Sequence, residues 1–286
     1  MPSRDLNHDI RLLTRAARAG VITLQEAVHV LGLEPRPATI RMAGLTARGW
    51  LRRIRRGVFL VIPPKTPVPQ EETARDEGAL AEALFGPCFF GGWSAAAQWH
   101  LDRGNRRAIL IVTAARVRRT SVRAEGHRFH LVHAPLGRIH GPDVLRPRPW
   151  SAPVSGPART IVDALCRPGW LGGAVYLADA LVTYRQSAHW DEEQFAEVLR
   201  VVGTGAAHRR LGFLMVAKRI EAGDLFQQAV AGRTAGVVDL DPGSPPEGPI
   251  DSFWGVRRNV NLEGWDLPED DDVEDDFIEG VDDPDP

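Results

Sequence analysis

Residues 37–62 read PATIRMAGLTARGWLRRIRRGVFLVI, and this stretch decides the fold of the N-terminal part of the chain. Ala38, Met42 and Leu45 are four and three residues apart, which is the spacing of an apolar stripe on one face of a helix. The stretch predicts a helix over residues 37–48. This helix opens on a proline, which is favourable in a first turn because its missing N–H would have no partner there.

A β-hairpin is expected directly after this helix. From residue 50 to 62, basic and apolar residues alternate around Arg55-Arg56-Gly57, which predicts two strands and a tight basic turn. Two further helices are expected before the helix at residues 37–48. Residues 6–19 carry apolar residues at helical spacing, and a second helix opens at Thr23 with Glu26 three residues on. That pattern is a capping box, in which each side chain accepts a hydrogen bond from the other residue's backbone N–H.

Three short helices and an Arg-rich hairpin within residues 1–62 are typical of a winged helix-turn-helix DNA-binding domain. Arginine can bind guanine in the major groove, isoleucine can contact a thymine methyl group, and hairpin arginines can bind phosphates. The DNA-binding residues predicted on this basis are Arg36, Thr39, Ile40, Arg41 and Arg48 on the helix, and Arg52, Arg53, Arg55 and Arg56 on the hairpin. The alternative is a winged helix used only for protein contacts, with these arginines as a solvated face.

Charge is divided unevenly along the chain. Thirteen of the 37 acidic residues and none of the 35 basic residues lie in residues 263–286. Residues 1–262 contain the remaining 24 acidic residues and all 35 basic residues, so they have a surplus of eleven positive charges. A basic body with an acidic tail indicates a polyanionic ligand and a tail that screens the same surface. The alternative is a tail that only keeps a basic protein soluble.

The length of 286 residues predicts two domains, because a domain averages ~150 residues. Four prolines in residues 63–69 predict a stiff linker over residues 63–76. Strand patterns at residues 108–113 and 126–134 lie among helical segments. The predicted fold class is α+β, with a winged helix-turn-helix at residues 1–62, a larger mixed α/β domain at 77–262 and a disordered acidic tail at 263–286.

Several short motifs occur in a characteristic order. They are RIRRGVF (53–59), GWSAA (92–96), IVT (111–113), VSGPARTIVDAL (154–165), RLGFL (210–214), DLDP (239–242) and NVNL (259–262). In this order the chain resembles the AbiEi antitoxins of type IV toxin–antitoxin systems, including their mycobacterial relatives, over about residues 5–262. It departs from them at Gly156 and Ala158, where the family commonly has acidic residues.

The resemblance implies an N-terminal winged helix that binds double-stranded operator DNA and a mixed α/β antitoxin domain. It also implies repression of the chain's own operon and antagonism of a nucleotidyltransferase toxin without a stable complex. A basic surface on the second domain is implied as well, and the residues that match it here are Arg116, Arg118, Arg119 and Arg123. The alternative for these four is a solvated basic loop.

The sequence predicts neither a catalytic nor a metal site. Residues 92–96 lack the second glycine of the G-x-S-x-G nucleophile elbow, so Ser94 is interpreted as a helix cap. His127, His130 and His133 are three residues apart, which on a strand puts the middle one on the opposite face, and no acidic partner is near them in sequence.

The remaining chemically active residues are interpreted as structural. Arg159 and Asp163, four residues apart on one predicted helix, are expected to form a surface or inter-helix ion pair. Cys88 and Cys166 make no disulfide framework, and no apolar stretch is long enough to cross a membrane. We therefore expect a cytoplasmic protein that is not an enzyme, with no cofactor, no metal, no membrane contact and no small-molecule substrate.

Two other functions stay open at this point. One is a protein-interaction module that binds and neutralises a partner toxin directly, and the other is a nucleic-acid-processing enzyme. Co-purification with a neighbouring nucleotidyltransferase would favour the interaction module, whereas operator binding without co-purification would favour the type IV mode.

Overall fold

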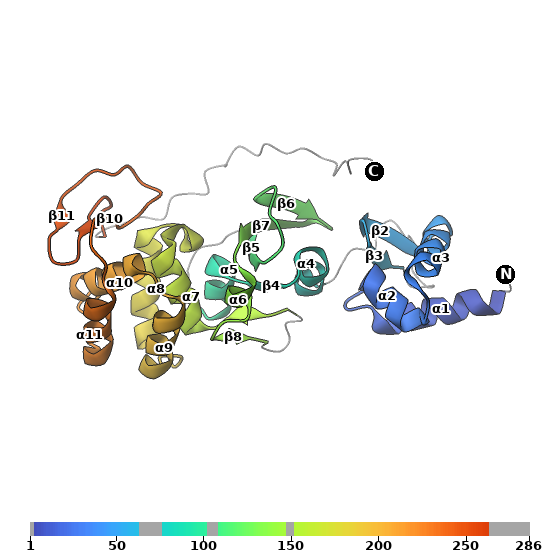
Figure 1. Cartoon of the computed structure of the whole chain (residues 1–286), viewed down its shortest axis with the longest axis horizontal. Helices are drawn as coiled ribbons and strands as arrows, with labels where there is room; N and C mark the ends of the chain where they lie inside the picture. Colours follow the sequence, from blue (N-terminus) through green and yellow to red (C-terminus); the bar gives the residue numbers. More distant parts are fainter. Residues whose placement is uncertain (1–2, 63–75, 102–107, 147–151, 263–286) are drawn as a thin grey trace.

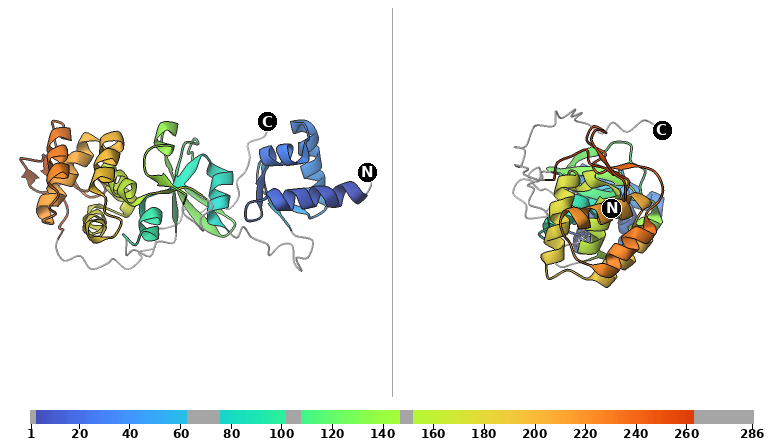
Figure 2. Two further views of the ribbon diagram at one scale, coloured as in Figure 1. Left: turned by 90° about the horizontal axis from the view of Figure 1, so that it is seen from below. Right: turned by 90° about the vertical axis from the view of Figure 1, so that its left-hand side faces the viewer.

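The chain is a mixed α/β protein with three regions along its long axis (Figure 1). This computed structural model describes residues 3–62, 76–101, 108–146 and 152–262. The N-terminal helices and strands lie at one end, a six-stranded sheet lies in the middle, and helices gather at the other end (Figure 2). This agrees with the predicted α+β class. The predicted linker, apart from Asp76, and the predicted acidic tail lie outside the described residues.

The N-terminal region has three helices and a small antiparallel sheet. Its elements are α1 (Ser3–Ala16), β1 (Val21–Thr23), α2 (Leu24–Leu31), α3 (Pro35–Ala47), β2 (Leu51–Arg55) and β3 (Val58–Val61), with the strand order β1-β3-β2. The capping box is confirmed: the Thr23 N–H donates to Glu26 at 2.8 Å, and the Glu26 N–H donates to the Thr23 hydroxyl at 3.2 Å. Helix α3 begins two residues earlier than predicted: extended Glu34 is its N-cap residue, and the backbone carbonyl of Glu34 accepts the N–H of Ala38 at 2.9 Å.

Strand β3 is buried on both faces. Phe59 and Val61 pack against α1–α3, in a core that includes Leu13, Met42, Leu45 and Leu51. Val58 and Leu60 point the other way, into a core with Val21 and, from the second region, Leu80, Leu84 and Phe90. Burial on both faces explains why residues 58–61 form a continuous apolar run instead of an alternating one.

The central sheet is mixed, with the strand order β6-β7-β5-β4-β9-β8. Its strands are β4 (Cys88–Phe90), β5 (Ile109–Thr113), β6 (Ser121–Ala124), β7 (His127–His133), β8 (Val144–Leu145) and β9 (Val154–Ser155). Three helices contact this sheet: α4 (Glu77–Phe85), α5 (Gly92–Gln98) and α6 (Leu136–Ile139). Helix α4 also contacts β1, so it joins the N-terminal region to the central sheet.

The C-terminal region is helical, with a second small sheet. It contains α7 (Pro157–Cys166), the 3-10 helix η2 (Pro168–Leu171), α8 (Ala174–Gln186), α9 (Glu192–Val202), α10 (Gly205–Ala217) and α11 (Gly223–Gly232). The two-residue strands β10 (Val238–Asp239), β12 (Val256–Arg257) and β11 (Ile250–Asp251) pair in that order. These helices share one large apolar core, which makes the region a single packed unit.

The motif at residues 154–165 is structural. Arg159 and Asp163 are 1% and 2% exposed, and Arg159 Nε donates to Asp163 Oδ2 at 2.8 Å. The expectation of a surface or inter-helix pair is therefore wrong: this pair is internal to α7 and buried. The guanidinium also donates to the carbonyls of Arg138 and Pro142, so it ties α7 to α6 and to the segment after it. Gly156 leaves room for the Asp143 carboxylate, which accepts the N–H of Arg159 at 2.9 Å.

The later motifs meet in one place. Arg210 of α10 donates to the carbonyl of Asp239 from Nε and Nη2, and from Nη1 to the carbonyl of Leu165. Asn259 donates to the carbonyl of Asp241 and accepts its N–H. Because buried arginines are tolerated when their donors are satisfied, these residues fix the helices to the small sheet.

Gly212 provides the sharpest packing constraint on α10. A Cβ there would overlap the Trp254 ring, so Gly212→Ala is expected to lower the free energy of unfolding by about 1–3 kcal/mol, as overpacking does. Gly223→Ala at the start of α11, where nothing lies within 4 Å, is the matched control. Urea titrations of both variants measure the difference, and equal midpoints for the two would contradict this packing.

Candidate nucleic-acid interface

Helix α3 buries one face and exposes the other. Ala38, Met42 and Leu45 are at most 1% exposed, which confirms the predicted stripe. Four of the five residues predicted to read DNA from this helix are exposed, namely Arg36, Thr39, Ile40 and Arg48. Ile40 is 74% exposed, a large apolar side chain in water at the middle of a helix face.

Two of these exposed residues are engaged by their own helix. The Thr39 hydroxyl donates to the carbonyl of Pro35 at 2.8 Å, and Arg48 Nη1 donates to the carbonyl of Gly44 at 2.9 Å. The hydroxyl of Thr39 can still accept a hydrogen bond. Arg36 and Ile40 are therefore the residues of α3 best placed to contact a ligand.

The prediction that Arg41 lies outside the packed stripe is wrong. Its Nε lies 2.5 Å from Asp9 Oδ2 of α1, and the two side chains are 19% and 14% exposed. The reason is visible in the spacing, because Arg41 follows Ala38 by three residues and precedes Leu45 by four. It therefore lies on the buried face, where it holds α3 against α1.

The hairpin arginines divide between two directions. Arg53, Arg55 and Arg56 are exposed, as predicted for phosphate contacts. Arg52 is not directed to solvent: its Nη1 and Nη2 donate to the two carboxylate oxygens of Glu125 at 2.8 and 2.6 Å. Arg52 alternates along β2 with its neighbours and lies on the face of the sheet that the second region covers, so its assignment as a phosphate-binding residue is corrected.

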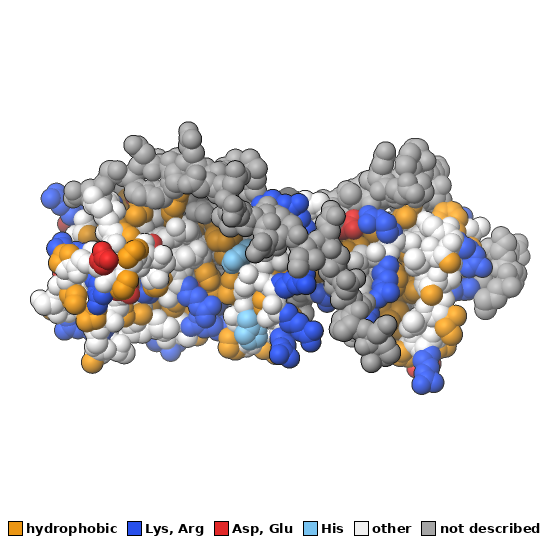
Figure 3. Space-filling model, turned by 90° about the horizontal axis from the view of Figure 1, so that it is seen from above, with side chains coloured by type: hydrophobic (Ala, Val, Ile, Leu, Met, Phe, Trp, Pro, Cys, Tyr) orange, Lys and Arg blue, Asp and Glu red, His pale blue; other side chains and the backbone are white. Residues whose placement is uncertain are grey.

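The four basic residues predicted to bind DNA from the second region are exposed. Arg116, Arg118 and Arg119 lie between β5 and β6, as the sequence predicts. Arg123 lies on β6 itself rather than in a loop, and it is directly opposite Arg128 of β7, a residue that was not predicted to belong to the site. In the sequence, the turn Glu125-Gly126 between two alternating segments indicates a hairpin, and with it strand β6. On the face seen from above, Lys and Arg side chains gather over the middle of the molecule and over its N-terminal region (Figure 3).

Residues considered for catalysis have structural partners. The Ser94 hydroxyl accepts the N–H of Leu110 at 2.8 Å, and α5 is capped by Gly91, so the interpretation of Ser94 as a cap is wrong. Burial lowers the pKa of His130. Within the described ranges, no three His, Cys, Asp or Glu residues are grouped so as to hold a metal ion.

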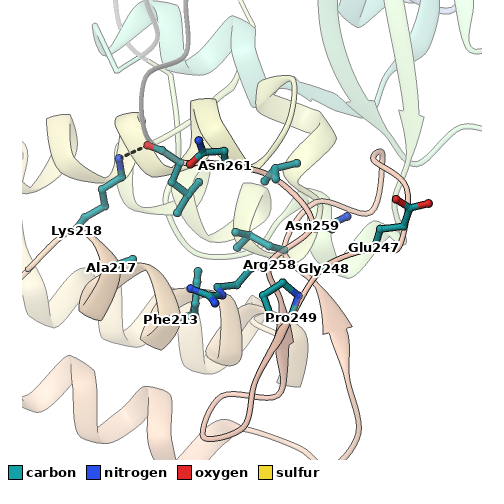
Figure 4. Close-up of a pocket in the computed structure, with 12 residues that line it drawn as sticks. Phe213, Ala217, Lys218, Glu247, Gly248, Pro249, Arg258, Asn259 and Asn261 are labelled. Carbon is teal, nitrogen blue, oxygen red and sulfur yellow. Dashed lines mark hydrogen bonds between the residues drawn. The ribbon is translucent and has the colours of Figure 1, made fainter.

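One cavity of about 610 Å³ lies beside α10 and the last described residues (Figure 4). Lys218 extends to the carbonyl of Leu262, to which it donates at 3.1 Å. The amide of Asn259 donates to the carbonyls of Asp241 and Pro245. No serine, cysteine or histidine is among the twelve residues that line it, so these residues offer neither a serine or cysteine nucleophile nor an imidazole base.

Comparison with known proteins identifies a fold relative. No protein-family model matches the chain, and no curated protein matches it. Among solved structures, the crystal structure of the Rv2827c protein from Mycobacterium tuberculosis is similar, with 21% sequence identity, 89% of each chain covered and a TM-score of 0.52. The chain thus shares a mixed α/β fold with that protein. No helix in the described part of the chain has the length and apolar character of a membrane span.

Arg41 yields a stability prediction. Arg41→Ala leaves Asp9 without its partner and is expected to destabilise the N-terminal region by about 1–3 kcal/mol. Arg48→Ala, on the exposed face of the same helix, is the charge-matched control and should change stability far less. Thermal unfolding of the full chain measures both, and a larger loss for Arg48→Ala would contradict the assignment.

Proposed function

We propose that this chain is a DNA-binding antitoxin that represses its own toxin–antitoxin operon and counteracts a nucleotidyltransferase toxin in the type IV mode. The observation that carries the proposal is the exposed face of α3, which presents Arg36 and Ile40, together with the exposed arginines of the turn at residues 55–57. Arginine and isoleucine suit the guanine edge and the thymine methyl group of a major groove.

The order of elements supports a winged helix-turn-helix. Helices α1, α2 and α3 are followed by the β2–β3 hairpin, and β1 completes the small sheet. In a domain of this kind α3 enters the major groove and the hairpin turn lies against the phosphate backbone. Arg53, Arg55 and Arg56 then supply the phosphate contacts, together with the basic residues 116–123 of the second region.

The antitoxin part of the proposal rests on the resemblance to the AbiEi family. In that family the antitoxin counters the toxin without a stable complex. The fold shared with the mycobacterial Rv2827c protein is compatible with this assignment.

A fluorescence-anisotropy titration tests the DNA-binding half. The full chain is titrated against its own upstream duplex and a scrambled duplex at two salt concentrations. We expect tighter binding to the upstream duplex and weaker binding at higher salt. Failure to bind either duplex would overturn the proposal.

The contribution of the hairpin turn to binding can be measured from the salt dependence. Arg55→Ala combined with Arg56→Ala should weaken binding to every duplex and flatten the log–log salt dependence by about 0.9 for each phosphate that is no longer neutralised. Arg200→Ala combined with Arg219→Ala removes the same charge from exposed positions on and after other helices. If the two double variants gave the same slope, net charge rather than the turn would account for binding.

Helix α3 makes a separate prediction about sequence preference. Arg36→Ala should cost about 1–3 kcal/mol of affinity for the upstream duplex and much less for the scrambled one. Arg11→Ala on α1 is the control, because it removes an exposed arginine from the same region. Anisotropy with both duplexes measures the discrimination. Equal losses on both duplexes for Arg36→Ala would argue against base reading.

Direct binding of the toxin is a second candidate function. The region around β10–β12 exposes three large apolar side chains, Val237, Ile250 and Phe253, at 50%, 48% and 54%. Exposed apolar groups of this size can form part of a protein interface. Co-purification of a neighbouring nucleotidyltransferase, lost with Phe253→Ser, would support this function, and its absence alongside operator binding would favour the type IV mode.

A further inference from the structure

The turn between β6 and β7 has an unusual residue in a constrained position. Glu125 and Gly126 form a two-residue turn between the paired residues Ala124 and His127, with φ angles of +50° and +79°. Such turns favour Asn, Asp or Gly, because other residues rarely adopt a positive φ. A glutamate persists in this strained conformation only where its surroundings hold it there. We therefore expect its side chain to have a partner.

That partner is Arg52 of the N-terminal region. Both carboxylate oxygens of Glu125 accept hydrogen bonds from Arg52, at 2.8 and 2.6 Å, across 73 residues of sequence. The Glu125 side chain is only 6% exposed, and that of Arg52 is 35% exposed. Strand β2 is an edge strand of the small sheet and β6 is an edge strand of the central sheet, so the pair joins two sheet edges.

Apolar side chains of β2 and β6 join one core near this pair in sequence. Ile54 of β2 and, on β6, Val122 and Ala124 pack against the core that also contains Val58 and Leu60. Apolar contact holds the two regions together but is not directional. A bidentate arginine–carboxylate pair is directional, so it fixes the rotation of one region on the other. Another ion pair across the junction, Arg18–Glu82 at 3.0 Å, involves an arginine that is 60% exposed and constrains the rotation less.

We infer that Glu125 is a positioning residue, which orients α3 and the basic β2–β3 turn relative to the basic residues of β6 and of the segment before it. The part of this inference that concerns nucleic acid rests on the proposed function. With the pair intact, Arg55 and Arg56 act on the same duplex as Arg118, Arg119 and Arg123. Arg52 itself contributes orientation and no phosphate contact.

The test combines an orientation readout with a binding readout, both on the full chain. Spin labels at Ala43→Cys on α3 and Val201→Cys on α9 report the distance between the regions, with Cys166→Ala in every sample and buried Cys88 retained. Anisotropy compares a duplex of about one helical turn with one of about three turns that share a central sequence. The variants are Glu125→Gln, the exchanged pair Arg52→Glu with Glu125→Arg, and the control Glu197→Gln. Glu197 is an exposed carboxylate paired with Arg200 within α9, so its loss changes the charge equally without touching the junction.

Glu125→Gln is expected to broaden the distance distribution. It should also lower the ratio of the affinity for the long duplex to that for the short duplex by at least about tenfold. Binding of the short duplex should stay within about twofold, since the surface of α3 is unchanged. The exchanged pair should restore the narrow distribution, and Glu197→Gln should behave as the unmodified chain.

An unchanged distance distribution in Glu125→Gln would overturn the inference. A broadened distribution with the long-duplex affinity intact would overturn its nucleic-acid part. If the distribution broadened while the unmodified chain bound no duplex, the positioning role would stand and the proposed function would fall.

Discussion

Burial of both faces of β3 is the constraint on which the rest of the structure depends. One face completes the core of α1–α3, and the other lies against α4 and the central sheet. Burying Val58 and Leu60 removes from water apolar surface that would be exposed in an isolated N-terminal region. The N-terminal region is thus built to dock on the second region, while α3 and the β2–β3 turn keep exposed residues.

The arginines of this chain serve three physical roles. Arg159, Arg209 and Arg210 are buried, and they donate to backbone carbonyls. Arg41 and Arg52 pair with carboxylates at contacts between elements. A third group, on α3, the β2–β3 turn and residues 116–123, is exposed where a polyanion can reach it. The positive surplus of the sequence therefore overstates the binding surface, because part of it holds the fold together.

Local patterns predicted local structure well. The capping box, the apolar stripe of α3 and the hairpin after it depend on residues within a few positions of one another, and each occurs where the sequence indicates. The predictions that were wrong for Arg52 and Arg159 concern side chains whose partners are distant in sequence. Nothing near Arg52 in sequence points to Glu125, 73 residues later, and nothing near Arg159 points to the carbonyl of Arg138 as its acceptor. Arg41 is different, because its spacing from Ala38 and Leu45 was readable and indicated the buried face.

We propose that α3 and the β2–β3 turn form the surface that contacts DNA. Hydrogen exchange of the full chain, measured by mass spectrometry with and without its upstream duplex, tests it most directly. We expect added protection in residues 35–59, weaker with a scrambled duplex and abolished at high salt. Binding of the duplex with protection confined to α8–α11 and the β10–β12 sheet, and none in residues 35–59, would contradict it.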